Sequence, residues 1–304
     1  MPILGTIASS WKSAGTLAVI AIGNTGTVVT TVTKILITTS GTASNWGDLT
    51  EARDITACVG STTRAVWAGG NTTTPVNTMD YMTMASGGNA TSFGTLATTR
   101  KEAAGINNTT RGVICCGYNV TPINGTLSSL EYITIATTGN AASFGDLASP
   151  GSTANVGAAS SPTRGVIYGG YSGGTDMWYI TTATTGTAAT FGTKPSGGQS
   201  SGVSNGTRGV FNGNTSNRLI LDYVTIATTG NSTTFGNLST GRYYSAGVSN
   251  ATYGIWAYGQ TSGGNVSSSE YITIATTGNA ASFGDLTTVA GNSQGTSVSN
   301  GGLQ

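Results

Sequence analysis

Histidine is absent from the 304 residues of this sequence. A Ser-His-Asp or Cys-His system needs an imidazole to take the proton of its nucleophile, and histidine is a principal ligand of zinc. Histidine-dependent catalysis and histidine metal sites are therefore excluded. Any general acid–base catalysis would fall on the 11 carboxylates.

Four of the carboxylates recur at one place, each directly before a tyrosine, and four arginines recur at the start of a Gly-containing apolar stretch. A catalytic centre needs an asymmetric set of groups, so this recurrence indicates a structural role. We expect the two sets to form ion pairs within or between the recurring units, and a ligand-binding ring of arginines is the alternative. The carboxylates are Asp80, Glu131, Asp222 and Glu270, and the arginines are Arg64, Arg111, Arg164 and Arg208.

Metal and phosphate chemistry has weak support in the sequence. Asp48, Asp146 and Asp285 follow a recurring aromatic-Gly pair, but the other units carry Thr or Asn there, which favours backbone capping over metal ligation. The glycine-rich stretch 169–174 is not followed by the Gly-Lys-Ser/Thr of a phosphate-binding loop. We expect no metal and no cofactor.

The composition indicates an all-β chain. It has 47 Gly and only 8% charged residues, and its abundant Thr and Val suit strands while Gly and Asn suit tight turns. The net charge of +1 is not gathered into runs, so no nucleic-acid partner is expected. The apolar run 17–22 is much shorter than the ~20 residues of a membrane helix, so no membrane insertion is expected either.

The sequence repeats itself. An aromatic residue followed by Gly occurs six times at intervals of about 47 residues, a period typical of propellers and solenoids. Each pair is preceded by a segment alternating apolar residues with Thr, such as 133–136, and by a Gly turn, which together predict a β-hairpin. The six aromatic residues are Trp46, Phe93, Phe144, Phe191, Phe235 and Phe283.

Two further strands complete each unit: the Gly-containing apolar stretch, as at 164–170, and a small-residue strand before it, as at 247–250. Four antiparallel strands per unit predict a propeller blade. Residues 295–300 repeat the small-residue strand with no unit after them, whereas the stretch 17–23 lacks that strand. We therefore predict a six-bladed β-propeller of four-stranded antiparallel blades, with a ring closed by the C-terminal strand joining the N-terminal blade.

The predicted organisation is an N-terminal docking arm, residues 1–14, followed by the propeller, residues 15–304. Apolar residues of the arm have no counterpart in the repeat, so we expect them to dock on another protein. The arm residues are Ile3, Leu4, Ile7 and Trp11, and the units are approximately 15–61, 62–108, 109–161, 162–205, 206–250 and 251–304.

Aromatic residues that break the repeat are the candidates for binding, because scaffolding needs the same residue in each unit whereas a binding patch is made of exceptions. Trp67 and Trp256 lie within predicted strands, so we expect them in the core between blades. The predicted binding residues are Tyr118, Tyr171, Trp178, Tyr243, Tyr244 and Tyr258.

The order of apolar run, Gly-Gly, spacer, acidic-Tyr and aromatic resembles the kelch repeat, although the kelch aromatic is usually Trp and the Gly doublet is intact only at 69–70 and 169–170. The Thr/Gly-rich core at 132–140, with Phe-Gly-Asp-Leu at 144–147, is similar to repeats in structural proteins of marine tailed bacteriophages. The opening residues 1–10 also resemble phage virion proteins.

The phage resemblance implies a non-enzymatic virion protein, in the tail or a fibre, that takes part in assembly and attachment to the host surface. Its partners would be other virion proteins and a host-surface glycan or receptor. A capsid-surface decoration protein and a cellular kelch-like interaction module are the alternatives. A glycan-acting enzyme would need an asymmetric cluster of arginines, Tyr, Glu and Asp, and no such set is visible.

Overall fold

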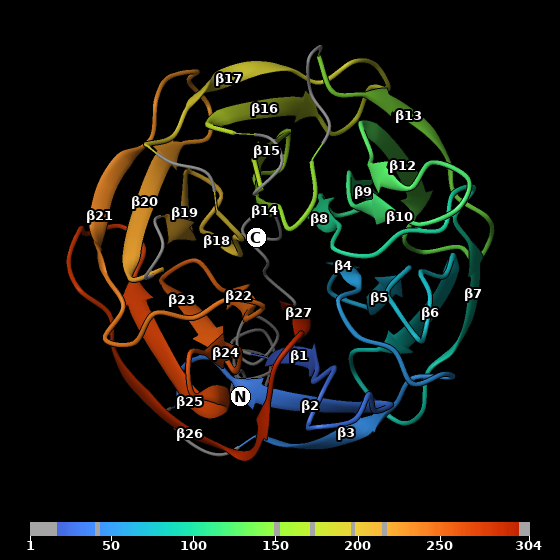
Figure 1. The fold of residues 1–304 in the computed structure, drawn as a ribbon, viewed down its shortest axis with the longest axis horizontal. Coiled ribbons are helices and arrows are strands. Elements are labelled where there is room, and N and C mark those ends of the chain that lie inside the picture. Colours follow the sequence, from blue (N-terminus) through green and yellow to red (C-terminus); the bar gives the residue numbers. More distant parts are fainter. Residues whose placement is uncertain are drawn as a thin grey trace, which may run out of the picture.

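The computed structural model describes residues 17–39, 43–148, 153–170, 174–195, 198–214 and 218–297. Within these ranges the chain forms six small antiparallel sheets and no helix. The sheets stand around a central axis as the blades of a six-bladed β-propeller, with the inner strands at the axis and the outer strands at the rim (Figure 1). The predicted fold class is confirmed.

The blades are numbered in chain order, and their strands are given from the axis outward. Blade 1 contains β27 (Gln294–Ser297), β1 (Leu17–Ala21), β2 (Thr31–Leu36) and β3 (Ser44–Asp48). Blade 2 contains β4 (Ala57–Gly60), β5 (Arg64–Ala68), β6 (Thr78–Thr83) and β7 (Thr91–Thr95). Blade 3 contains β8 (Ala104–Asn107), β9 (Arg111–Cys115), β12 (Ser129–Thr134) and β13 (Ala142–Asp146).

Blade 4 contains β14 (Gly157–Ser160), β15 (Arg164–Tyr168), β16 (Asp176–Thr181) and β17 (Ala189–Thr193). Blade 5 contains β18 (Gly202–Ser204), β19 (Arg208–Asn214), β20 (Ile220–Thr225) and β21 (Thr233–Asn237). Blade 6 contains β22 (Ala246–Ser249), β23 (Tyr253–Ala257), β25 (Gly264–Thr273) and β26 (Ala281–Ala290). Two short additions lie in loops: β10 (Tyr118–Asn119) pairs with β11 (Gly125–Thr126), and β24 (Gln260–Thr261) pairs with β25.

Ring closure follows the predicted route. β27 pairs antiparallel with β1, with Ala18 opposite Ser297 and Ala21 opposite Gln294. The inner strand of blade 1 is thus supplied by the last described segment of the chain, far from the other three strands in sequence. Each sequence unit begins at the second strand of one blade. It therefore ends with the inner strand of the next blade.

The aromatic-Gly pair serves as a clasp between neighbouring blades. In β7 of blade 2, Gly94 has φ +149°, and a Cβ placed on it would lie 2.3 Å from the Gly139 carbonyl oxygen in the hairpin of blade 3. The Gly139 amide donates a 2.8 Å hydrogen bond to the Phe93 carbonyl. Only glycine allows this approach, which explains why the pair recurs. The same amide-to-carbonyl bond joins residues 88 and 46, 186 and 144, 230 and 191, and 278 and 235.

The hydrophobic core lies between the blades. Val and Ile side chains of the second strands pack against the neighbouring blade, and the two tryptophans expected in this core are fully buried there. Trp67 donates its indole N–H to the Gln294 carbonyl at 3.2 Å, across the blade 1–2 junction. Trp256 does the same toward Ser201, at 3.5 Å, across the blade 5–6 junction. The prediction for both residues is confirmed.

Candidate functional site

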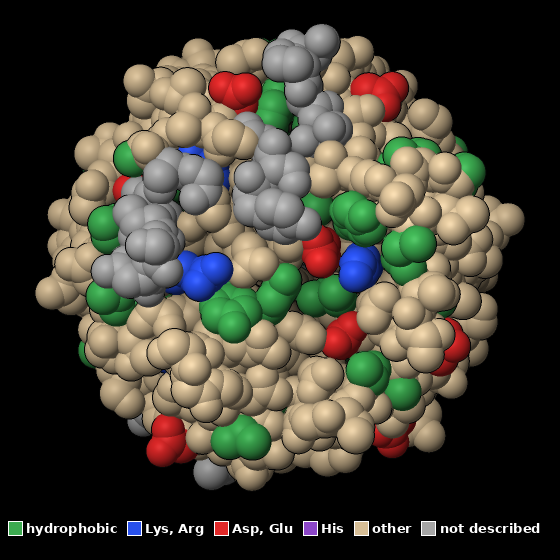
Figure 2. Space-filling model, in the orientation of Figure 1, with side chains coloured by type: hydrophobic (Ala, Val, Ile, Leu, Met, Phe, Trp, Pro, Cys, Tyr) green, Lys and Arg blue, Asp and Glu red, His purple; other side chains and the backbone are tan. Residues whose placement is uncertain are grey.

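The two ends of the propeller differ, and we name them the hairpin face and the loop face. The hairpin face carries the turns between the two inner strands and the hairpins between the two outer strands. The loop face carries the segments that connect consecutive blades, together with the loops between the second and third strands. Figure 2 shows one face of the ring, on which Lys and Arg side chains lie towards the centre with hydrophobic side chains beside them, whereas Asp and Glu side chains lie both near the centre and at the periphery.

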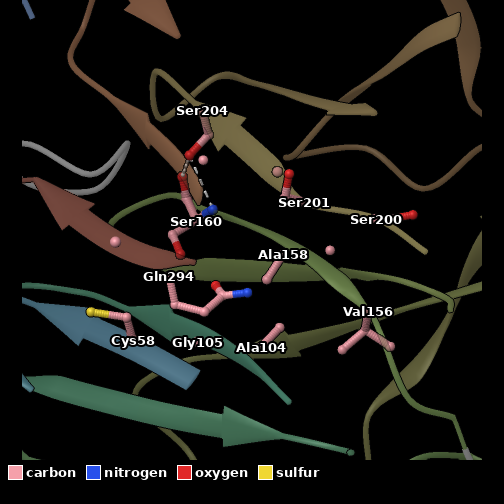
Figure 3. Close-up of a pocket in the computed structure, with 14 residues that line it drawn as sticks. Cys58, Ala104, Gly105, Val156, Ala158, Ser160, Ser200, Ser201, Ser204 and Gln294 are labelled. Carbon is pink, nitrogen blue, oxygen red and sulfur yellow. Dashed lines mark hydrogen bonds between the residues drawn. The ribbon is translucent and has the colours of Figure 1, made fainter. Parts of the chain in front are cut away.

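The axis of the ring is almost closed. The cavity along it has a volume of about 40 Å³ and is lined by inner-strand residues such as Cys58, Ala158 and Gly202 (Figure 3). A Cβ on Gly105 would lie 2.0 Å from the Cys58 carbonyl oxygen, so the inner strands touch through their backbones. There is room for one or two water molecules but not for a substrate, and we therefore place the candidate site at the mouth of the axis on the loop face.

A collar of backbone hydrogen bonds surrounds this mouth. The amide of Glu102 donates to the Ile55 carbonyl at 3.0 Å, and the amide of Asn155 donates to the Glu102 carbonyl at 2.9 Å. Further collar bonds run from Ser200 to Asn155, from Ser293 to Tyr244 and from Ile55 to Asn292. Left-handed backbone costs about 1–3 kcal/mol at each Ile, Glu and Tyr position of the collar, whereas asparagine adopts it more readily, so the collar holds a strained geometry at those three residues. The residues with positive φ are Ile55, Glu102, Asn155, Tyr244 and Asn292.

On one side of the mouth lies a cluster that we call the Tyr–Arg cluster, made of Gln199, Arg218, Tyr243 and Tyr244. The Arg218 guanidinium stacks over the Tyr243 ring, 4.3 Å from its centroid, and the Tyr243 and Tyr244 rings meet edge to face at 5.2 Å. The Gln199 amide donates to the Tyr244 hydroxyl at 2.8 Å. The cluster combines aromatic faces with a cation and an amide; elsewhere on the loop face Lys101 lies over the Tyr118 ring, 5.7 Å from its centroid.

The opposite side of the mouth carries carboxylates. Glu102 accepts a 2.7 Å hydrogen bond from Asn155, and Asp54 accepts one of the same length from Asn292. Burial raises the pKa of Asp54, and its hydrogen bond from Asn292 opposes the rise. The Lys101 ammonium also lowers the pKa of Asp54, so this side of the mouth carries both a cation and carboxylates, whereas the Tyr–Arg side carries a cation alone.

The structure separates the predicted binding residues. Tyr118, Tyr243 and Tyr244 lie on the loop face, where Tyr118 donates its hydroxyl to Asn124 at 3.1 Å. Trp178 is 2% exposed and Tyr258 is 0% exposed, so the prediction that these two contribute a binding surface is wrong. Tyr171 and the arm residues Ile3, Leu4, Ile7 and Trp11 lie outside the described residues.

Both corrections have one cause: an exceptional aromatic residue fills the place of a missing repeat group. Trp178 occupies the β16 position at which blades 2, 3, 5 and 6 have a carboxylate, and it packs in the blade 3–4 core. In blade 1 the same position is Thr33, and its hydroxyl lies 3.3 Å from the hydroxyl of Tyr258 in blade 6. An aromatic exception to the repeat thus indicates compensation in the core at two of the described candidate binding positions and partial exposure at the other three.

The expected ion pairs between the two recurring sets are also wrong. Three of the four recurring carboxylates pair with other arginines, which lie in the segments connecting blades and were missed. The Arg100 guanidinium donates to Glu131 at 2.5 Å, and both side chains are at most 5% exposed. Glu131 also accepts a hydrogen bond from the Ala97 amide at 2.6 Å, so the segment connecting blades 2 and 3 is bound to blade 3. The equivalent pairs are Arg53 with Asp80, at 3.1 Å, and Arg242 with Glu270, at 2.5 Å.

The recurring arginines at the hairpin face have a different role. Arg111 stacks over Tyr132, 4.4 Å from the ring centroid, and donates to the carbonyls of Thr182 and Ala183 in the next blade at 3.2 and 2.7 Å. Arg64, Arg164 and Arg208 stack on Tyr81, Tyr179 and Tyr223 in the same way. Each of these guanidiniums has a ring contact within its blade and donates Nη1 to the next blade, which favours a structural role over a ligand-binding ring.

The carboxylate of blade 5 departs from the pattern. Asp222 accepts a 2.8 Å hydrogen bond from the Tyr168 hydroxyl, and the cation in the connecting segment is Lys194. The Lys194 ammonium donates to the Gly169 carbonyl and lies 4.5 Å from the centroid of the Tyr168 ring. Burial lowers the pKa of Lys194 to about 8, and Asp222 opposes the shift.

No group of three or more metal-ligating side chains occurs in the part of the chain that the structure describes. Asp48 and Asp146 instead accept hydrogen bonds from Thr30 and Ser128 at 2.8 and 3.0 Å. Among the described residues there is also no helix long and apolar enough to span a membrane.

The fold and the site define a six-bladed β-propeller with a closed axis and a candidate binding surface at the centre of its loop face. No protein-family model matches this chain, and no curated protein matches it.

Proposed function

We propose that this protein is a non-enzymatic virion structural protein of a tailed bacteriophage, a tail or fibre component that takes part in assembly and attaches to the host surface. The loop face would make the attachment contact, and the target would be a host-surface glycan or receptor. Other virion proteins would be the assembly partners.

The observation that carries the binding function is the Tyr–Arg cluster. Its residues have no counterparts in the repeat, and they lie at the mouth of the axis on the loop face, where the connecting segments of all blades converge. A scaffold needs recurring contacts, so a non-recurring, partly exposed group of two tyrosines, an arginine and an amide supports recognition.

The chemistry of this cluster suits a sugar. Tyrosine rings present flat apolar faces that match the C–H face of a pyranose, while guanidinium and amide groups bind hydroxyl or carboxylate oxygens. Because the mouth is shallow, with a cavity of only about 10 Å³ between the collar residues, it suits a terminal sugar or an extended chain lying across it.

The arrangement of the carboxylates supports a non-enzymatic role. Glu131, Glu270 and Asp80 are buried in ion pairs, and Asp222 is buried behind Tyr168. Asp54 and Glu102, at the mouth, each accept an asparagine amide at 2.7 Å, and the cavity beside Glu102 has a volume of only about 10 Å³. Glycoside hydrolysis commonly needs two carboxylates that share an open cleft, with one on either side of the scissile bond.

The virion assignment is supported by the resemblance of the Thr/Gly-rich repeat to phage structural proteins. An electron cryomicroscopy map of the particle from which the chain comes would test it. A tail-tip or fibre position is the expected outcome. A position on the capsid shell would replace the proposal with decoration, and absence from any particle would replace it with a cellular interaction module.

Binding is tested separately on a glycan array. We expect Tyr243→Ala and Arg218→Ala each to weaken the strongest glycan signal at least about tenfold, because both remove a wall of the cluster. Thr137→Ala, an exposed change on the hairpin face, is the matched control and should leave the signal unchanged. Equal signals from all three variants would contradict the proposed site.

A further inference from the structure

Four consecutive blade junctions share one built-in contact. In the junctions from blade 2 to blade 6, an arginine at the start of the second strand stacks on a tyrosine of the third strand at 4.3–4.4 Å. Its Nη1 then donates to carbonyl oxygens at the end of the third strand in the next blade; Arg208, for example, reaches Ile274 and Ala275 at 3.1 and 2.8 Å. Each junction therefore holds a guanidinium between an aromatic ring and backbone acceptors.

The ring-closing junction between blades 6 and 1 lacks this cation. Tyr253 occupies the place of the arginine at the start of β23, and its ring meets Tyr271 edge to face, 5.7 Å between centroids and 80° between planes. Ile37 and Thr38 of blade 1 stand where the acceptor residues stand in the other junctions. The neutral phenol of Tyr253 does not supply the positive charge that the arginine guanidinium brings to these carbonyls in the other junctions.

A cavity opens at this junction. Its volume is about 250 Å³, and its walls include Ile37, Thr38, Tyr253, Tyr271, Ser282 and Phe283. Two tyrosine rings at nearly a right angle form two walls of an aromatic cage, the arrangement that recognises organic cations. Thr38 and Ser282 are exposed, so the cavity is open to solvent. We call it the closing-junction pocket.

We propose that the closing-junction pocket binds an arginine side chain of a neighbouring protein. The occupant is inferred from the molecule itself, because four equivalent junctions contain a guanidinium in contact with the same two kinds of group. Arginine is favoured over lysine because a planar guanidinium can stack on a ring and donate in its own plane to a carbonyl at once, whereas an ammonium is a compact, strongly hydrated charge. This site is separate from the loop-face cluster and does not depend on the proposed function.

The first test uses small probes on the intact protein with ¹³C-labelled tyrosines. Nα-acetyl-arginine methylamide should shift the tyrosine ring signals in a saturable titration. The citrulline analogue has nearly the same shape without the charge, and we expect it to bind about three- to thirtyfold more weakly. The lysine analogue should lie between the two. Equal binding of the arginine and citrulline probes would overturn the proposal.

Variants at one position sharpen the test. Tyr253→Arg restores the repeat residue, so its own guanidinium should take the pocket and abolish probe binding while the melting temperature stays the same or rises. Tyr253→Phe keeps the aromatic wall and should bind as the original protein does, whereas Tyr253→Leu should lose most binding. If Tyr253→Arg folds and still binds the arginine probe as the original protein does, the pocket is not the site.

The same variants keep the two sites distinguishable. Tyr253→Arg should leave glycan binding at the loop face unchanged, and Tyr243→Ala should leave the arginine probe unaffected. Loss of both activities in Tyr253→Arg, with the fold intact by melting temperature, would contradict an independent pocket.

Discussion

The hairpin face and the loop face use arginine in opposite ways. At the hairpin face, Arg164 is partly exposed, stacks on Tyr179 at 4.3 Å, and reaches across to the next blade. At the loop face, Arg100 is fully buried and is bound by Glu131 and by the carbonyls of Cys116 and Ser129. The first kind joins blade to blade, and the second fixes the connecting segment to the blade that follows.

The difference shows which face is free to change. The hairpin face repeats the same short Thr-rich hairpin, so its shape follows from blade contacts alone. The loop face is fixed from beneath by buried ion pairs, which leaves its outer residues without a scaffolding task. A surface supported in this way can vary in sequence while its backbone stays in place.

Removal of β27 should have the largest effect on stability, because this strand closes the ring that supports both faces. A chain ending at residue 293 leaves the inner edge of β1 unpaired and opens the blade 1–2 and blade 6–1 junctions. We expect aggregation and loss of the cooperative unfolding transition, measured by size-exclusion chromatography and thermal melting. A soluble, fully folded monomer would contradict the closure argument.

Loss of a buried loop-face arginine should come next. Arg100→Met leaves Glu131 buried without its cation, which costs about 3–5 kcal/mol of unfolding free energy. The double variant Arg100→Met/Glu131→Leu removes both charges and should recover most of that loss. Urea unfolding of both variants measures the difference, and equal losses in the two would show that packing rather than charge governs the site.

Lys194 gives the loop face of blade 5 a pH response. Because burial lowers its pKa to about 8 from the ordinary 10.5, the folded chain releases this proton before the unfolded chain does. Its contribution to stability therefore rises between pH 8 and 10.5, by about 3 kcal/mol. Lys194→Met should lack that rise when the unfolding free energies of the two proteins are subtracted at each pH. A constant difference across this window would contradict the lowered pKa.

A hairpin-face arginine should matter least. Arg164→Leu removes a half-exposed stack and its hydrogen bonds to the carbonyls of Ile226 and Ala227, and we expect a loss of about 1–2 kcal/mol. Arg164→Lys keeps the charge over Tyr179 and should lose less. If Arg164→Leu costs as much as Arg100→Met, the contrast between the faces is wrong.

The sequence predicts the fold well because the fold depends on local periodicities. Alternating Thr and apolar residues define the strands, and the glycine after each aromatic residue marks the clasp, where a side chain has no room. The unmatched small-residue strand at the C-terminal end predicts the closure. Each of these three signals can be recognised in the sequence without knowing which residues meet in the folded chain.

The partners of the recurring charges could not be assigned by recurrence alone, because two sets of arginines lie within reach of the acidic-Tyr pair. Strand alternation separates them: Asp80 and Tyr81 are adjacent in β6 and point to opposite faces. Arg64 stacks on Tyr81, so it cannot also pair with Asp80. The buried arginines recur in only three connecting segments. Tyr243 and Tyr244 were predicted as exceptions to the repeat, but Gln199 and Arg218 carry no pattern, so these two members of the Tyr–Arg cluster required the structure.

The clasp has a mechanical consequence. It lies at the rim, the greatest distance from the axis, where a single hydrogen bond and a glycine contact have the longest lever arm against the tilting of a blade. The collar at the mouth restrains the same blade at the shortest radius. A blade held at both radii resists torque, so a load applied to one blade is shared among the five junctions whose described residues form the clasp rather than absorbed by one of them.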